Sequence, residues 1–183
     1  MGNELTTRTS AIESALIEGD LSGLNPEQRL SYYKNVCESL GLNPMTKPFA
    51  YIRLNGKLVL YALKDATDQL RASRGVSITK LERERIDDIY AVTAYATDSK
   101  GRSDSSIGAV TIGSLRGDAL ANALMKAETK AKRRVTLSIC GLGMLDETEI
   151  ETIKDAQPVT EVVTIEQPQA VHIDETGEVI LPP

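Results

Sequence analysis

The sequence has no tryptophan, one phenylalanine (Phe49) and one histidine (His172). The histidine stands alone near the C-terminus, so the chain offers no basis for histidine-based acid–base catalysis. Six tyrosines supply nearly all the aromatic surface, and any platform that stacks on nucleic-acid bases would therefore have to use tyrosine. The core must consist mainly of leucine, isoleucine, valine and alanine.

Other common features are also missing. Cys37 and Cys140 lack the short spacings of a zinc site or a disulfide framework, which predicts no metal and a reducing compartment. No apolar run approaches the ~20 residues that span a bilayer, and no secretory signal opens the chain. The GxxxxGK[ST] loop of ATP-binding proteins is absent. We expect a cytoplasmic protein that uses no membrane, no ATP and no other cofactor.

Negative charge is abundant overall but unevenly placed. The net charge of the 183 residues is -5, yet residues 151–183 alone carry seven acids and one base. The other 150 residues hold 20 bases and 19 acids, so an acidic total does not exclude a polyanion as partner. We therefore expect three parts: an N-terminal segment with a short helix (1–24), a core (25–150) and an acidic, flexible tail (151–183).

The first half of the core predicts helices around a hairpin. Asn25 can cap a helix that begins at Pro26 and ends at Gly41. Its apolar positions recur every three or four residues and predict one buried stripe: Leu30, Tyr33, Cys37 and Leu40. Asn55-Gly56 between two β-rich runs predicts a tight hairpin with Ile52 opposite Val59. A helix over residues 65–73 should pack on that hairpin.

The second half predicts an antiparallel meander followed by a long helix. Three segments rich in β-branched residues and tyrosine, 76–85, 89–97 and 105–112, are separated by polar turns. The longest helical pattern runs from Gly117 to about Ile139. The fold class is therefore α+β, with a small antiparallel sheet of a hairpin plus a three-stranded meander, packed with helices. Beyond residue 155 the pattern predicts at most a weak hairpin.

The long helix carries a concentrated positive charge in the stretch KAETKAKRR, residues 126–134. At about 100° per residue, four cations fall in one arc: Lys126, Lys130, Arg133 and Arg134. Small and apolar residues occupy the adjacent arc, and Ala127 and Ala131 should let the helix approach the sheet closely. Lys132 should point elsewhere. Because only Glu128 interleaves with the five bases, we expect this face to bind a polyanion rather than to be merely solvated.

Four further cations lie where a groove could use them: Lys57, Lys64, Arg71 and Arg74. Neither Asn55-Gly56-Lys57 nor Gly141-Leu142-Gly143 has the form of a nucleotide-phosphate loop, because such loops precede a helix. The repeating phosphates of a nucleic-acid strand remain as the ligand, held by positioning charges without sequence reading.

Two blocks of the sequence resemble the RecT/Redβ class of phage single-strand annealing proteins. The first is LGLNPMTKPFAYIRLNGKLVLYALKDATDQLRASRGVSI, and the second is ALMKAETKAKRRVTLSICGLG. Their order and spacing, over about residues 27–145, are similar to that family. The resemblance implies ATP-independent binding and annealing of single-stranded DNA in homologous recombination, by a chain that forms rings or helical filaments. It matches Lys126, Lys130, Arg133 and Arg134 to the family's basic helix, and the other four cations less closely.

The resemblance also implies a bacterial host cytoplasm and, as possible partners, an exonuclease or the host single-strand-binding protein. Family members often have a longer C-terminal region for such partners, whereas this chain has only its acidic tail. That tail could fold back on the basic groove, recruit a basic partner or simply solubilise the chain.

Two alternatives stay open at this point. One is an accessory protein that protects single-stranded DNA without annealing it. The other is a metal-dependent nuclease using Asp118, Glu128 and Lys130, which have the residue types for Mg²⁺ binding and water activation. A helix, however, directs residues i and i+2 about 200° apart, which disfavours the nuclease.

Overall fold

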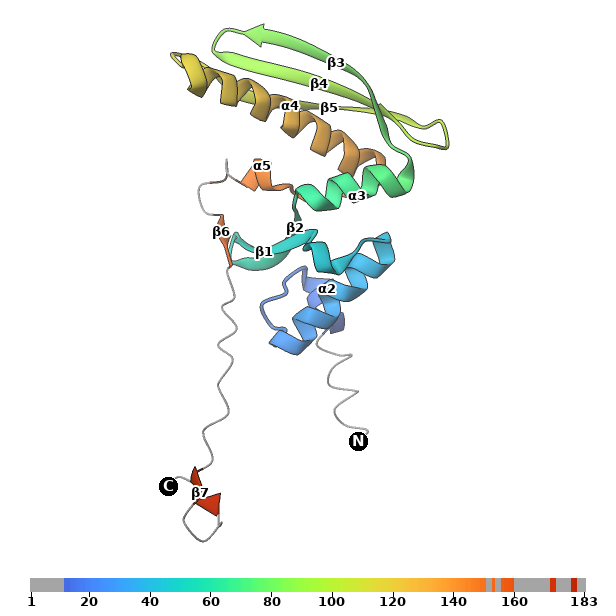
Figure 1. Cartoon of the computed structure of the whole chain (residues 1–183), viewed down its shortest axis with the longest axis vertical. Coiled ribbons are helices and arrows are strands. Elements are labelled where there is room, and N and C mark those ends of the chain that lie inside the picture. The colour runs from blue at the N-terminus through green and yellow to red at the C-terminus, as the bar shows by residue number, and fades with distance from the viewer. Residues whose placement is uncertain (1–11, 151–152, 154–155, 160–171, 174–178, 181–183) are drawn as a thin grey trace.

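The computed structural model describes residues 12–150, 153, 156–159, 172–173 and 179–180 (Figure 1). Its fold is α+β, as predicted. The helices are α2 (Pro26–Leu40), α3 (Lys64–Arg74), α4 (Gly117–Ile139) and α5 (Glu147–Ile150), with a 3-10 turn η1 (Pro44–Thr46) and a further helical segment over 12–18. The strands are β1 (Phe49–Leu54), β2 (Lys57–Ala62), β3 (Ser77–Ile86), β4 (Ile89–Thr97), β5 (Ser103–Thr111), β6 (Gln157–Pro158), β7 (His172–Ile173) and β8 (Val179–Ile180).

The hairpin β1–β2 forms in the predicted register, with Ile52 opposite Val59. Asn55 and Gly56 have φ angles of 51° and 80°, the left-handed values that this two-residue turn requires. One strand was not predicted: β6 pairs antiparallel with β1 and places Pro158 opposite Ile52. Proline is tolerated there because β6 lies at the edge of this sheet, whose strand order is β2-β1-β6.

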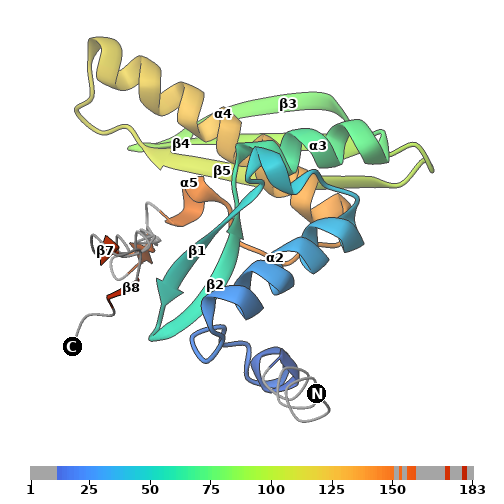
Figure 2. The same ribbon diagram turned by 60° about the horizontal axis from the view of Figure 1, so that its bottom comes forward.

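The meander β3-β4-β5 forms a second antiparallel sheet, and α4 lies across one of its faces (Figures 1 and 2). Gly108 of β5 allows this close approach. A Cβ atom at this position would lie 2.4 Å from the Ala127 carbonyl oxygen and 2.4 Å from the Ala131 nitrogen. Ala127 and Ala131 are fully buried, which confirms the prediction that these alanines bring the helix close to the sheet.

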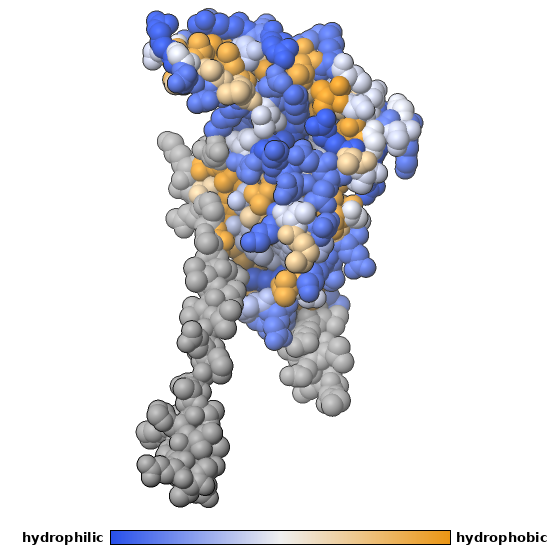
Figure 3. All heavy atoms as spheres, in the orientation of Figure 1, coloured by the Kyte–Doolittle hydropathy of each residue, from blue (hydrophilic) through white to orange (hydrophobic). Residues whose placement is uncertain are grey.

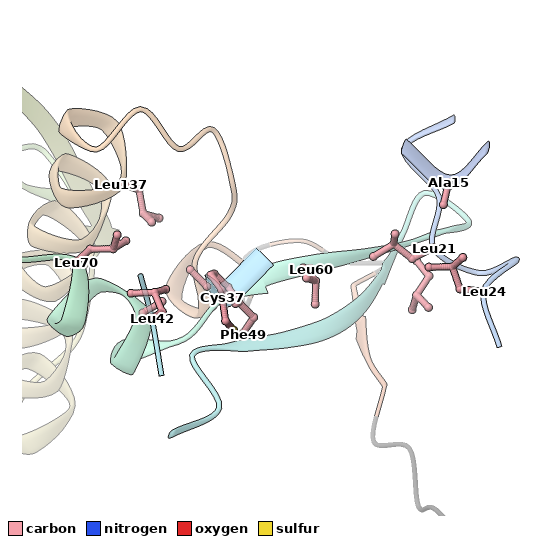
Figure 4. Packing of buried hydrophobic residues seen from close by; sticks show 12 residues of the cluster. Ala15, Leu21, Leu24, Cys37, Leu42, Phe49, Leu60, Leu70 and Leu137 are labelled. Carbon is pink, nitrogen blue, oxygen red and sulfur yellow. The ribbon is translucent and has the colours of Figure 1, made fainter. Parts of the chain in front are cut away.

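Buried side chains form two main clusters, one on each sheet. The cluster on the hairpin extends from the ends of α3 and α4, at Leu70 and Leu137, to the N-terminal segment, at Ala15, Leu21 and Leu24 (Figure 4). The second lies between the meander and α4. Residues of the predicted N-terminal segment thus belong to the same core as the hairpin.

Two predictions differ in detail from the structure. Leu30 was predicted in the buried stripe of α2 but is 55% exposed, because it lines an open groove beside β1 instead of the core; Cys37 of the same stripe is fully buried. In the tail, β7 and β8 pair as a short antiparallel hairpin. Most of the predicted flexible tail, and the first 11 residues of the predicted N-terminal segment, lie outside the described residues.

Candidate nucleic-acid interface

The four cations predicted on one arc of α4 divide between two sides of the helix. Lys130 and Arg134 face the open edge of β5, where they line a shallow hollow of about 640 Å³ together with Thr93, Ile107 and neighbouring strand residues. Lys130 is only 8% exposed. Arg133 instead faces α3. These cations share one arc of an ideal helix. Because α4 packs against the sheet, however, Lys130 and Arg134 lie at one site and Arg133 lies at another.

The side of α4 that faces α3 carries the larger collection of cations. A cavity of about 100 Å³ between the two helices is lined by Lys64, Thr67, Asp68, Arg71, Thr129, Lys132, Arg133 and Thr136. A second cavity, of about 190 Å³, follows at the C-terminal ends of both helices and is lined by Ser73, Arg74, Val76, Asp98, Ser99, Lys100, Arg102, Ile139 and Cys140. We call the two cavities together the basic crevice. Among the described residues, seven cations and two carboxylates line it.

Three of the predicted cations from α3 meet α4 in this crevice. Among the residues that the structure describes, the side chains of Lys64, Arg71 and Arg74 have no ion-pair partner. The Nε atom of Arg71 is buried without a hydrogen-bond acceptor. A buried donor without an acceptor is costly unless water or a ligand satisfies it. An anion in the crevice would supply such an acceptor.

Acidic side chains hold the cations that α4 contributes. Lys132 pairs with Glu128 at 2.6 Å, and Glu128 also accepts a hydrogen bond from Arg83 of β3 at 2.8 Å. The hydrogen bond from Lys132, followed by that from Arg83, lowers the pKa of Glu128. Lys132 was predicted to point away from the basic arc but lies in the crevice beside Arg133. Lys132 thus points away from Lys130 and Arg134, as predicted, but shares its cavity with Arg133, the fourth cation of the arc.

The short helix α5 adds two acids whose contacts with α4 the sequence did not predict. Glu147 forms an ion pair with Arg133, and Glu149 lies 3.2 Å from Arg134. Asp146 orients this segment, since its Oδ1 atom accepts hydrogen bonds from the backbone N–H groups of Thr148 and Glu149. The expectation that Glu128 alone interleaves with these bases holds within α4 but not for the folded chain.

The second cavity includes Lys100 and Arg102, from the turn between β4 and β5, which sequence reasoning treated only as polar turn residues. Burial raises the pKa of the Cys140 thiol, while the charges of Arg74 and Arg102 act in the opposite direction. The turn is fixed against α3 by the Ser99 hydroxyl, which donates to the Arg74 carbonyl at 3.2 Å. Only folding brings these cations beside Arg74, and no spacing in the sequence signals it.

Four predicted cations lie away from the crevice: Lys130 and Arg134 line the hollow at the edge of β5, and Lys57 and Lys126 line neither. Lys57 starts β2, and its Nζ atom donates to the Glu18 carbonyl at 2.7 Å. Figure 2 shows the hairpin turn at the end of β1 and β2 that is far from α3 and α4. Lys126 lies nearer the N-terminus of α4, half-buried, and lines neither cavity of the crevice.

None of the described residues that line the basic crevice is a tyrosine. Tyr33 and Tyr51 pack on the hairpin cluster, and their hydroxyls donate to backbone carbonyls of Phe49 and Arg29. Tyr95 lies on the opposite face of the meander from α4, where it donates to Glu82 at 2.6 Å. The crevice therefore offers contacts to charges and hydroxyls rather than a surface for stacking bases.

The residues of the nuclease alternative do not converge. Glu128 is engaged by Arg83 and Lys132, whereas Lys130 faces the edge of β5. Within the described part of the chain, no three His, Cys, Asp or Glu side chains are grouped as metal ligands would be. The same residues include no helix long and apolar enough to cross a membrane.

No family model and no curated protein matches the sequence. The function therefore has to be inferred from the chain's own residues.

Proposed function

We propose that this chain binds single-stranded DNA along the basic crevice and anneals complementary strands without ATP. One observation carries the proposal. Lys64, Arg71 and Arg74 of α3 line the same crevice as cations of α4 and of the β4–β5 turn. Residues from three separate segments concentrate positive charge in a chain whose net charge is -5. Such a concentration is typical of sites for repeating phosphates.

The chemistry of the crevice favours contacts to the DNA backbone. Arginine and lysine bind phosphate through charge-assisted hydrogen bonds, and the threonine hydroxyls that line the first cavity can add neutral ones. With tyrosine absent from the crevice, the bases would stay available for pairing with a second strand. Watson–Crick pairing would then supply all sequence discrimination, and the protein would reduce the repulsion between the two strands.

The resemblance to RecT/Redβ annealing proteins supports the same activity and adds the expected setting. A homo-oligomer, as a ring or a helical filament, would work in a bacterial cytoplasm beside an exonuclease or the host single-strand-binding protein. Annealing driven by base pairing needs no nucleotide hydrolysis, in agreement with the lack of an ATP-binding loop in the sequence.

Binding is tested with a labelled oligonucleotide in fluorescence anisotropy over a series of salt concentrations. Replacing Lys64, Arg71 and Arg74 together with glutamine should weaken binding strongly while leaving the circular dichroism unchanged. The slope of log affinity against log salt should fall by about 2, since each lost phosphate contact on a single strand removes about 0.7. Retention of the wild-type affinity and slope would overturn the proposal.

A matched control removes the same charge elsewhere. Lys34, Arg53 and Arg116 are exposed cations outside the crevice, and their replacement with glutamine should change the affinity little. Annealing is then followed by mixing two complementary labelled strands. The wild-type chain should accelerate pairing, whereas a protein that only protects single strands would slow it.

A further inference from the structure

The helical segment over residues 12–18 presents an apolar ridge to solvent. Ala15 faces the hairpin and is 5% exposed, whereas Leu16 and Ile17 are 62% and 85% exposed. Glu13 and Glu18 flank them and are exposed as well. The two side chains are adjacent in sequence, and covering their aliphatic carbon in a contact with another protein surface would be favourable. We call Leu16 and Ile17 the apolar ridge.

An apolar groove of about 560 Å³ lies between α2, η1 and β1. It is lined by Pro26, Glu27, Arg29, Leu30, Tyr33, Pro44, Lys47, Phe49 and Tyr51. Leu30 is 55% exposed at its rim. The tyrosine hydroxyls are already hydrogen-bonded to backbone groups, and burial raises the pKa of Tyr51 to about 12. The groove therefore presents ring faces and aliphatic carbon to whatever enters it.

The ridge and the groove are separate surfaces of the chain, because neither Leu16 nor Ile17 lines the groove. Lys57, at the hairpin turn, holds the ridge segment through the Glu18 carbonyl, and the Leu21 N–H donates to the Leu58 carbonyl at 2.8 Å. Figure 4 shows Ala15 at one end of the hairpin cluster and Leu42 and Leu70 toward the other. The groove instead follows α2 from Pro26 to Tyr33 and β1 from Phe49 to Tyr51. The described ridge therefore does not fill the groove of its own chain.

From these observations we infer that the apolar ridge of one copy docks in the apolar groove of the next. The charges agree with this occupant, because Glu13 and Glu18 flank the ridge whereas the exposed Lys47 lines the groove. A contact between two different surfaces is heterologous, so it propagates into a ring or an open filament. The inference rests on the proposed function in one respect, because it takes the homo-oligomer from there. It adds the two surfaces that form the contact between copies.

The test uses two complementary variants of the full chain in sedimentation velocity without DNA. Leu16→Glu/Ile17→Glu removes the ridge and keeps the groove, whereas Leu30→Glu blocks the groove and keeps the ridge. The wild-type chain should form assemblies, and each variant alone should sediment as a monomer. An equimolar mixture should form a 1:1 dimer and nothing larger, since only one ridge and one groove remain. A monomeric wild type, or either variant assembling like the wild type, overturns the inference.

A control and a second measurement guard against misfolding. Ile107→Glu changes an isoleucine that is 56% exposed on the meander and should leave the assemblies intact. Mixing Ile17→Cys with Leu30→Cys under oxidation should give a disulfide-linked dimer between copies, whereas Ile17→Cys with Ile107→Cys should not. Absence of the first disulfide, in chains with wild-type circular dichroism, counts against the inference.

The outcome is separable from that of the proposed function. Anisotropy with the ridge variant measures DNA binding at the crevice of a monomer, where Lys64, Arg71 and Arg74 are unchanged. A monomeric variant that still binds DNA supports both conclusions. Assemblies of wild-type protein that follow the ridge and groove but bind no DNA would overturn the proposed function alone.

Discussion

Arg133 of α4 forms an ion pair with Glu147 of α5. The arginine is one of the cations expected to hold a phosphate, and its guanidinium already has an anionic partner within the chain. Arg134 has the same relationship to Glu149. The short helix α5 therefore occupies part of the basic surface of α4 and competes with any other anion for it.

Neutralising α5 should consequently strengthen DNA binding. In Glu147→Gln/Glu149→Gln both side chains keep a hydrogen-bond acceptor but lose the charge, so the two arginines become available to phosphate. Each partly exposed pair stabilises by about 0.2–1 kcal/mol, so the two pairs together predict a roughly two- to thirtyfold higher affinity. Fluorescence anisotropy with a labelled oligonucleotide measures it.

The control for this experiment is Glu84→Gln/Asp87→Asn, on β3 and in the turn that follows it. Both acids are exposed and form no ion pair among the described residues, so their replacement changes the net charge by the same two units without releasing an arginine. If both variants raise the affinity equally, the effect is one of net charge, and the competition by α5 is refuted.

Local patterns predicted most of the fold. The turn at Asn55-Gly56 requires positive φ at both residues, which determined the hairpin register. The length of α4 was predictable from its periodicity, from Gly117 to Ile139. Strand β6 was not predicted, because its two residues are too few to show the alternation of apolar and polar side chains that marks a strand. Its pairing depends instead on the open edge of β1.

The site was less predictable than the fold. Helical geometry alone placed four cations on one arc, but the close approach of α4 to Gly108 directed Lys130 to the edge of β5 and left Arg133 facing α3. The pairing of Glu147 with Arg133 depends on where the chain turns after α4. Such contacts are tertiary, and no single-sequence period encodes them.

Lys57 should contribute to stability rather than to DNA binding. Its ammonium group donates to the Glu18 carbonyl and ties the N-terminal segment to the hairpin turn, away from the crevice. Lys57→Met should lower the free energy of unfolding by at most about 1 kcal/mol, the usual net value of one hydrogen bond. Urea unfolding measures this, and anisotropy should show unchanged affinity. A loss of affinity as large as that of Arg71→Gln would instead place Lys57 in the interface.

Gly108→Ala should destabilise the packing of α4 on the meander. The new methyl group would lie 2.4 Å from two backbone atoms of the helix, so the helix must move away from β5. Overpacking of this kind costs about 1–3 kcal/mol, measurable by urea unfolding. Gly143→Ala is the matched control, because a Cβ atom there meets nothing within 4 Å. Equal stability of the two variants would contradict the close helix–strand contact.

Asp20 should make the stability of the chain depend on pH in the acid range. The Leu58 N–H and the Ser22 N–H each donate to its Oδ1 atom at 2.9 Å, and these bonds lower its pKa from 3.8 to about 2. A lowered pKa in the folded state stabilises the fold above the unfolded value and loses this effect as pH falls from about 4 to about 2. Asp20→Asn keeps an acceptor without the charge. Wild type should therefore be more stable than Asp20→Asn at neutral pH, and urea unfolding should show the difference shrinking across that range. A difference that stays constant down to pH 2 would mean that the carboxylate charge contributes nothing to holding the N-terminal segment on the hairpin.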